Sequence, residues 1–314
     1  MARLGDSVAE AAQCLLKGEL AGIPTETVYG LAANALQPEE VLKIYKAKNR
    51  PAFDPLIVHL SSASEMEKYA VEIPDMAWKL AREFWPGPLT LVLKKSPLIP
   101  DITTSGSNTV ALRVPSHPLT LALLQQLPFP LAAPSANPFG YVSPTTAAHV
   151  QAQLGHAICY ILNGGPCTVG LESTILDLSG AEPVLLRLGG LPREILETVT
   201  GKLTERLTQN SNPSAPGQLD SHYAPGCKIN LYPFGSEPPL KLHQLRMFSV
   251  WPKAAMPQWI LAPDGRTETA ASALFAALRR LDEESIQEAE IEMAEETGLG
   301  RAINDRLRRA AAKR

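Results

Sequence analysis

The sequence predicts an α/β protein of two domains: an open sheet over residues 1–200 and a smaller α/β unit over residues 227–314, joined by a linker of residues 201–226. Three observations support this. Short apolar runs typical of strands are interspersed with amphipathic helical patterns through the first 200 residues. A polar stretch rich in Pro, Ser and Asn then follows, as in linkers. A length of 314 residues also favours two domains over one.

The first elements are a helix, a strand and a second helix. Apolar residues at helical spacing predict a helix over Asp6–Lys17, and the apolar run Leu20–Ile23 predicts a strand. Proline suits a first helical turn because that turn needs no amide donor, so Pro38 begins the second helix. This helix carries Lys48 and Arg50 at its C-terminal end.

Further apolar runs predict strands, and amphipathic segments between several of them predict helices. The predicted strands are Leu56–Leu60, Leu89–Leu93, Val110–Val114, Leu131–Ala133, Ile158–Leu162, Ser173–Leu178 and Val184–Leu188. The predicted helices are Asp75–Phe84, His117–Leu127 and Thr145–Leu154. Strands mixed with helices in this way indicate an open α/β sheet.

The smaller domain follows the linker with a second, shorter pattern. Its predicted strands are Lys228–Leu231, Met247–Val250 and Trp259–Leu261, followed by an alanine-rich helix over Thr269–Leu281. A short segment near Ile291 then precedes a terminal helix that begins near Gly300. This order indicates a compact α/β unit.

Composition excludes several classes of protein. The net charge of −3 and the pI of about 6.1 argue against a constitutive nucleic-acid binder, which is usually basic. No apolar run is long enough to span a membrane, and no secretory signal is expected. The spacing of the four cysteines and the histidines fits no metal site, so we expect no bound metal, reduced thiols and a cytoplasmic location.

Two separated stretches carry the most informative polar residues. Lys48-x-Arg50 supplies two cations, and Ser135-x-Asn137 supplies a hydroxyl and an amide after a short strand. Cations and neutral donors together suit phosphoryl or nucleotidyl transfer, where catalysis is mostly positioning and charge neutralisation. The alternatives are solvated charges at a helix end and an ordinary turn.

Buried charges and glycine pairs leave further alternatives open. Arg113 and Arg187 lie within apolar strands, where each needs either a structural carboxylate or a bound anion. His59 is either a ligand contact or a hydrogen-bonded structural residue. Gly164-Gly165 and Gly189-Gly190 fit turns better than phosphate loops. The basic residues of the terminal helix predict a solvated face, and RNA contact is the alternative; they are Arg301, Arg306, Arg308, Arg309, Lys313 and Arg314.

Taken in order, the motifs resemble the threonylcarbamoyl-AMP synthase (YrdC-like) family in its long, two-domain form. The matching stretches in residues 1–200 are Pro24-Thr25-Glu26-Thr27-Val28-Tyr29-Gly30-Leu31, Lys48-x-Arg50-Pro51, Pro55-Leu56-Ile57-Val58-His59, Arg113-Val114-Pro115, Pro134-Ser135-Ala136-Asn137, Glu172-Ser173-Thr174-Ile175 and Arg187-x-Gly189. His222-Tyr223-Ala224-Pro225 and the segment Gly298–Leu307 resemble the linker and C-terminal domain of that form. The resemblance covers nearly the whole chain.

The resemblance implies a twisted, open mixed sheet followed by a Rossmann-like domain, and a nucleotidyltransferase. Its substrates would be threonine, bicarbonate and ATP with Mg²⁺, and its products threonylcarbamoyl-AMP and pyrophosphate. A separate transferase would then use the adenylate to modify tRNA, so neither stable nucleic-acid binding nor a membrane is expected.

Site residues are also implied by the resemblance. Threonine would contact Thr27, His59, Arg113, Ala133 and Ser173. ATP would contact Lys48, Arg50, Asp54, Thr109, Ser135, Asn137, Ser143, Arg187 and Tyr223, the last from a linker that covers the site. Lys48, Arg50, Ser135 and Asn137 would be catalytic.

The chain departs from the family pattern in two places, and two other functions remain as alternatives. Asp54 replaces the usual Asn, and its carboxylate would repel phosphate; Asn49 replaces a common Gly. One alternative is a translation-associated module that binds double-stranded RNA. The other is a carbamoyl-transfer domain with a different acceptor, against which the linker and C-terminal domain discriminate.

Overall fold

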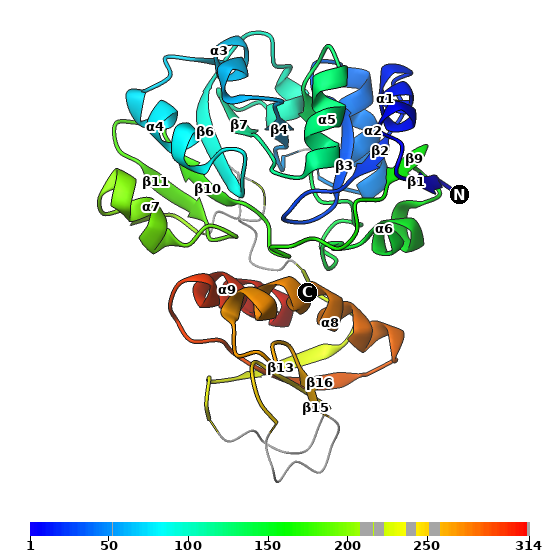
Figure 1. Cartoon of the computed structure of the whole chain (residues 1–314), viewed down its shortest axis with the longest axis vertical. Helices are drawn as coiled ribbons and strands as arrows, with labels where there is room; N and C mark the ends of the chain where they lie inside the picture. The colour runs from blue at the N-terminus through cyan, green and yellow to red at the C-terminus, as the bar shows by residue number, and fades with distance from the viewer. Residues whose placement is uncertain (52, 208–215, 217–222, 237–242, 251–257, 313–314) are drawn as a thin grey trace.

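The computed structural model describes residues 1–51, 53–207, 216, 223–236, 243–250 and 258–312. Figure 1 shows a large α/β domain and a smaller α/β domain beside it. Most of the expected linker, including His222, lies outside the described residues. None of the described helices has the length and apolar character needed to cross a bilayer.

The larger domain is built on a 12-stranded sheet that mixes parallel and antiparallel pairs, as the resemblance implied. The strand order is β1-β9-β2-β3-β8-β4-β7-β6-β10-β11-β12, with β5 beside β6. The strands are β1 (Arg3–Gly5), β2 (Ala21–Ile23), β3 (Gly30–Asn34), β4 (Ile57–His59), β5 (Ala70–Val71), β6 (Leu89–Lys95), β7 (Thr109–Arg113), β8 (Leu131–Ala132), β9 (Tyr160–Leu162), β10 (Thr174–Asp177), β11 (Val184–Arg187) and β12 (Thr204–Glu205). Its core is mainly aliphatic.

The larger domain contains the five predicted helices and two that were not predicted, α3 and α7. In chain order these helices are α1 (Val8–Leu16), α2 (Pro38–Lys48), α3 (Met66–Tyr69), α4 (Asp75–Phe84), α5 (Pro118–Gln126), α6 (Ala147–Leu154) and α7 (Arg193–Thr200). Helix α2 begins at Pro38 and ends at Lys48, and its C-cap residue Asn49 has a left-handed φ of 51°. Asn tolerates this conformation better than most residues, which explains why it can replace a glycine there.

The matched stretches at residues 24–31 and 134–137 meet because β3 pairs antiparallel with β8. The segment before β3 and the loop after β8 continue side by side, with Leu31 N donating to Pro134 O and Ala136 N donating to Tyr29 O. An isolated bridge joins Gly30 to Ser135. No strand was predicted at Gly30–Asn34, yet this strand brings the stretches at residues 24–31 and 134–137 together.

The smaller domain contains a four-stranded parallel sheet in the order β13-β16-β14-β15, covered by two helices. Its elements are β13 (Lys228–Tyr232), β14 (His243–Arg246), β15 (Gln258–Ile260), α8 (Thr267–Glu283), β16 (Glu288–Glu292) and α9 (Leu299–Ala311). The predicted strand Met247–Val250 is wrong, because β14 ends at Arg246. Strand β14 has no apolar run, because it carries two buried polar residues. Gln244 contacts Glu290 and Arg246 contacts Glu292.

Helices α8 and α9 lie on the side of the smaller sheet that faces the larger domain (Figure 1). One buried apolar cluster joins the domains, with Val28, Val142 and Leu171 packed among residues of α8 and α9. Gly170 makes this contact possible. A Cβ atom at that position would lie 2.4 Å from Ser272 Cα, so another residue would force the domains apart.

Candidate active site

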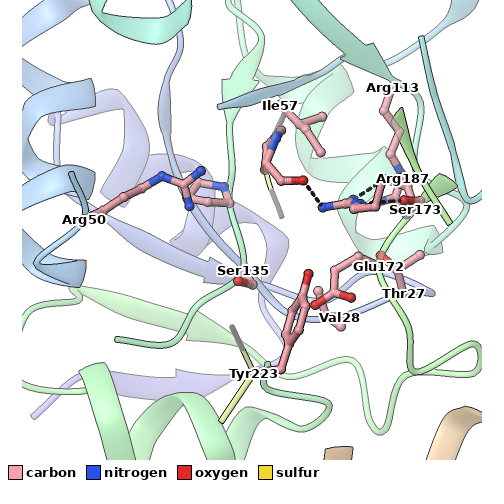
Figure 2. Close-up of a pocket in the computed structure, with 12 residues that line it drawn as sticks. Thr27, Val28, Arg50, Ile57, Arg113, Ser135, Glu172, Ser173, Arg187 and Tyr223 are labelled. Carbon is pink, nitrogen blue, oxygen red and sulfur yellow. Dashed lines mark hydrogen bonds between the residues drawn. The ribbon is translucent and has the colours of Figure 1, made fainter. Parts of the chain in front are cut away.

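A small cavity lies where the ends of several strands meet the smaller domain (Figure 2). Three arginines, three hydroxyl side chains and one carboxylate line it together with apolar and aromatic groups. The lining residues are Thr27, Val28, Arg50, Ile57, Arg113, Pro134, Ser135, Glu172, Ser173, Arg187, Pro216 and Tyr223. Seven of the expected site residues therefore come together. The cavity volume is about 40 Å³ in this structure, so a nucleotide could enter only if the cavity opened.

Arg50 reaches the cavity from the end of α2, on the side opposite Arg113 and Arg187 (Figure 2). Its guanidinium lies 2.8 Å from Asp54 Oδ1, and it donates to the backbone oxygens of Asp54 and Pro55. Both side chains of this pair are buried. Burial raises the pKa of Asp54, while Arg50 and Lys48 oppose the rise.

Lys48 does not line the cavity, although it is fully buried beside it. Its ammonium group donates to Ser135 O at 2.5 Å and to Asn137 O. Burial and the neighbouring Arg50 lower the pKa of Lys48 well below its ordinary value. In this arrangement Lys48 fixes the loop of residues 134–138 to the end of α2.

Arg113 and His59 are neighbours on paired strands, since β4 and β7 run parallel with His59 opposite Arg113. Arg113 contacts Glu26 Oε1 at 2.7 Å, so it has the structural carboxylate that the sequence analysis considered, while still lining the cavity. His59 lies outside the lining. Burial and Arg113 lower the pKa of His59 to about 3, so its imidazole is neutral at physiological pH.

Arg187 and Ser173 form one hydrogen-bonded unit between β10 and β11 (Figure 2). Arg187 Nε donates to Ser173 O at 3.0 Å and Nη2 donates to Ser173 Oγ at 3.1 Å, while Nη1 donates to Pro216 O. Thr90 Oγ1 lies 2.7 Å from Ser173 Oγ. The arginine and the serine are therefore positioned together, and Pro216 closes over them.

Glu172 lines the cavity, although it was not among the predicted site residues. Ser143 Oγ donates to Glu172 Oε1 at 2.5 Å, and Arg306 Nε of α9 donates to Glu172 Oε2 at 2.8 Å. Arg306 was expected on a solvated face, which is wrong because its side chain is fully buried. The available signal for Glu172 was its place in the matched Glu-Ser-Thr-Ile stretch, and that for Arg306 was its place in the matched segment Gly298–Leu307.

Other expected site residues lie outside the lining. Asn137 Nδ2 donates to Pro138 O and Tyr141 O, and Ala133 is buried in β8's continuation, where its N–H donates to Ile57 O. Thr109 lies at the opposite end of β7 from Arg113, in a different surface hollow with Lys94 and Lys95. The structure thus brings Thr109 to no part of this cavity.

The fold and the cavity define an α/β protein whose strand ends bring several cations to one small cavity, the usual place for a ligand in such folds. Residues 13–189 match the Sua5/YciO/YrdC family model, described as "Telomere recombination", and residues 191–312 match the model "Threonylcarbamoyl-AMP synthase, C-terminal domain". The chain therefore belongs to the threonylcarbamoyl-AMP synthase family in its two-domain form.

Known threonylcarbamoyl-AMP synthases match this chain over almost its full length. The threonylcarbamoyl-AMP synthase of Pyrococcus abyssi is 39% identical over 97% of this chain and 94% of its own length. That of Bacillus subtilis is 40% identical over 98% and 93%, respectively. The crystal structure of P. abyssi Sua5 with L-threonine has a TM-score of 0.92 and 38% identity, covering 99% of this chain and 97% of that one. These matches confirm the predicted family, two-domain fold and enzyme class, and favour them over an RNA-binding module.

Proposed function

We propose that this chain makes threonylcarbamoyl-AMP from threonine, bicarbonate and ATP, releasing pyrophosphate and water. The observation that carries the proposal is the convergence of Arg50, Arg113 and Arg187 on one cavity with hydroxyl groups between them. Three cations suit the carboxylate of threonine and the phosphates of ATP, and the hydroxyl groups are neutral donors that do not add to the charge.

The chemistry requires two anions to react with each other. The amine of threonine and bicarbonate give a carbamate with loss of water. A carbamate oxygen then attacks the α-phosphorus, and the bond to the β-phosphate oxygen breaks as pyrophosphate leaves. Arg50 on one side and Arg187 on the other would neutralise the phosphates, whereas Arg113, already oriented by Glu26, would bind the threonine carboxylate. Catalysis is then mainly positioning and charge neutralisation.

The remaining residues fit supporting roles in this proposal. Lys48 and Asn137 would hold the loop of residues 134–138, whose Ser135 faces the substrates. Tyr223 and Pro216 would cover the reacting groups and exclude water from the labile adenylate. Mg²⁺ would arrive with ATP, because no cluster of three metal-ligating side chains occurs within the described ranges.

The product is a mixed anhydride of a carbamate and a phosphate, which water hydrolyses. In this proposal a separate transferase, which the family resemblance implies, would receive it and pass the threonylcarbamoyl group to tRNA. The cytoplasmic location, where such a partner would be found, stays a prediction.

The proposal is tested by incubating the chain with ¹³C-bicarbonate, threonine and Mg·ATP and measuring the adenylate by mass spectrometry. We expect a labelled threonylcarbamoyl-AMP and one pyrophosphate per adenylate. Valine, which has a methyl in place of the hydroxyl, is the control substrate and should react at least 10²-fold more slowly, since buried polar groups would lose their partner. ATP consumption without a labelled adenylate would contradict the proposal.

A further inference from the structure

Arg306 is the largest fully buried side chain among the described residues, although it lies on a markedly basic helix of the smaller domain. Each edge of its guanidinium contacts a different group. Nε donates to Glu172 Oε2 at 2.8 Å, Nη2 to Leu188 O at 2.8 Å and Nη1 to Asp305 Oδ2 at 2.6 Å. Two of these three acceptors belong to the larger domain.

The aromatic ring of Tyr223 completes this environment. The guanidinium carbon of Arg306 lies 5.0 Å from the centre of the Tyr223 ring, within cation–π range. The same ring stacks on Phe275 of α8 with centroids 5.6 Å apart. Tyr223 and Glu172 line the cavity (Figure 2). Arg306 does not line it but contacts both residues, so it supports two parts of the wall from behind.

Glu172 would be harmful to the proposed reaction if it had no counter-ion. A carboxylate in a cavity that binds triphosphate and carbamate repels both, and burial strengthens the repulsion because the local dielectric is low. Burial opposes ionisation of Glu172, but Arg306 and Arg187 outweigh it and hold its pKa below the ordinary value. The anion is therefore present and neutralised.

Both helices of the smaller domain converge on this carboxylate. Ser143, which donates to Glu172, has a backbone oxygen that accepts from Arg279 Nε of α8 at 3.3 Å. Arg279 also donates to Val142 O. On α9, Asp305 accepts hydrogen bonds from both Arg306 and Arg309, which orients these two arginine side chains. The contacts to Glu172 thus depend on the docked position of the whole domain.

We propose that Arg306 is a positioning residue for the adenylation site: it neutralises Glu172 and supports Tyr223, so that nucleotide affinity depends on the docked C-terminal domain. The proposal rests on the proposed function. Arginine suits this place because its guanidinium donates from three different nitrogens in one plane, toward three separate acceptors, while its face contacts an aromatic ring.

The test compares wild type with Arg306→Gln and with the double variant Glu172→Gln/Arg306→Gln, using adenylate formation at varied ATP. In Arg306→Gln the carboxylate is uncompensated, so we expect the KM for ATP to rise on the order of 100-fold with a smaller change in kcat. The double variant removes the repelling charge too, so its KM should return to within about tenfold of wild type.

The matched control is Arg308→Gln on the same helix, since Arg308 is half-exposed and pairs with Glu296 away from the cavity. It should behave as wild type. A structural role alone would lower the melting temperature and the active fraction but leave the KM for ATP unchanged. That result, or a double variant no better than Arg306→Gln, would overturn the proposal.

A second variant covers the case in which Arg306→Gln does not fold. Arg306→Lys keeps the charge but cannot meet all three acceptors, so we expect the KM for ATP to rise about tenfold. An unchanged KM in this variant would also overturn the proposal. Failure of the proposed function is distinguishable, because wild type itself would then form no adenylate.

Discussion

Two of the buried arginine–carboxylate pairs at the cavity are built in different ways. Arg50 and Asp54 are four residues apart in one loop, with 2.8 Å between guanidinium and carboxylate. Arg306 and Glu172 have the same separation but are 134 residues apart and belong to different domains. In the first pair the cation lines the cavity; in the second the carboxylate does. In the proposed function, one pair would therefore present charge to the substrates, and the other would neutralise charge that repels them.

The largest expected effect is that of replacing Arg50, the cation of the Arg50–Asp54 pair. If Arg50 neutralises phosphate, Arg50→Ala should lower kcat for adenylate formation about 100- to 1,000-fold, because a preorganised charge contact to the transition state is lost. Quantitative mass spectrometry of the product measures this. Lys46→Ala is the matched control, since Lys46 is an exposed cation on the same helix. Near-normal turnover of a folded Arg50→Ala protein would refute the role.

His59 extends the comparison to a buried base whose charged neighbour is Arg113 rather than a carboxylate. Its folded pKa of about 3 lies below the ordinary value, so the unfolded chain binds more protons as the pH falls below about 6.5. Stability should therefore decrease from pH 6.5 downward, by about 2 kcal/mol at pH 5 from this residue.

Urea unfolding of wild type and His59→Gln between pH 5 and 7.5 isolates this contribution. The variant should lose that part of the pH dependence, while His156→Gln on the exposed surface is the control. An identical pH dependence in wild type and His59→Gln would show that His59 is not held neutral by burial.

The smallest expected effects are those of replacing the two carboxylates, Asp54 and Glu172. Asp54→Asn removes a buried anion whose pKa burial already raises, and it leaves the charge of Arg50 to the nucleotide. We expect the KM for ATP to fall about two- to fivefold. Glu172→Gln, whose charge Arg306 already neutralises, should change this KM less. A higher KM in Asp54→Asn would mean that Asp54 orients Arg50 more than it repels phosphate.

Local patterns predicted the elements that depend on neighbouring residues. Helix α2 was expected from Pro38 and the cations at its end, and β4 from the apolar run that carries His59. Strand β14 was missed because its Gln244 and Arg246 have buried partners on β16, which no local pattern reveals. Strand β3 was missed because its five residues, Gly30–Asn34, are all buried and therefore show no alternation, and because Gly and Ala are poor strand formers.

The same distinction applies to the site. Arg50 and Arg187 lie within local motifs, so their place at the cavity could be predicted. Arg306 stands on a helix whose sequence resembles any basic, solvated face, and only domain packing buries it. Thr109 was expected at the site because of the family resemblance, but the length of β7 separates it from Arg113.

In the proposed function, threonine, bicarbonate and ATP react in the cavity between Arg50 and Arg187. The most direct test is a crystal structure of the chain with threonine, Mg²⁺ and an ATP analogue that cannot release pyrophosphate. We predict that the phosphates lie between Arg50 and Arg187, with the threonine carboxylate at Arg113 and the Tyr223 ring against the nucleotide. Electron density for the nucleotide outside this cavity, with Arg50 and Arg187 free of ligand, would contradict the account.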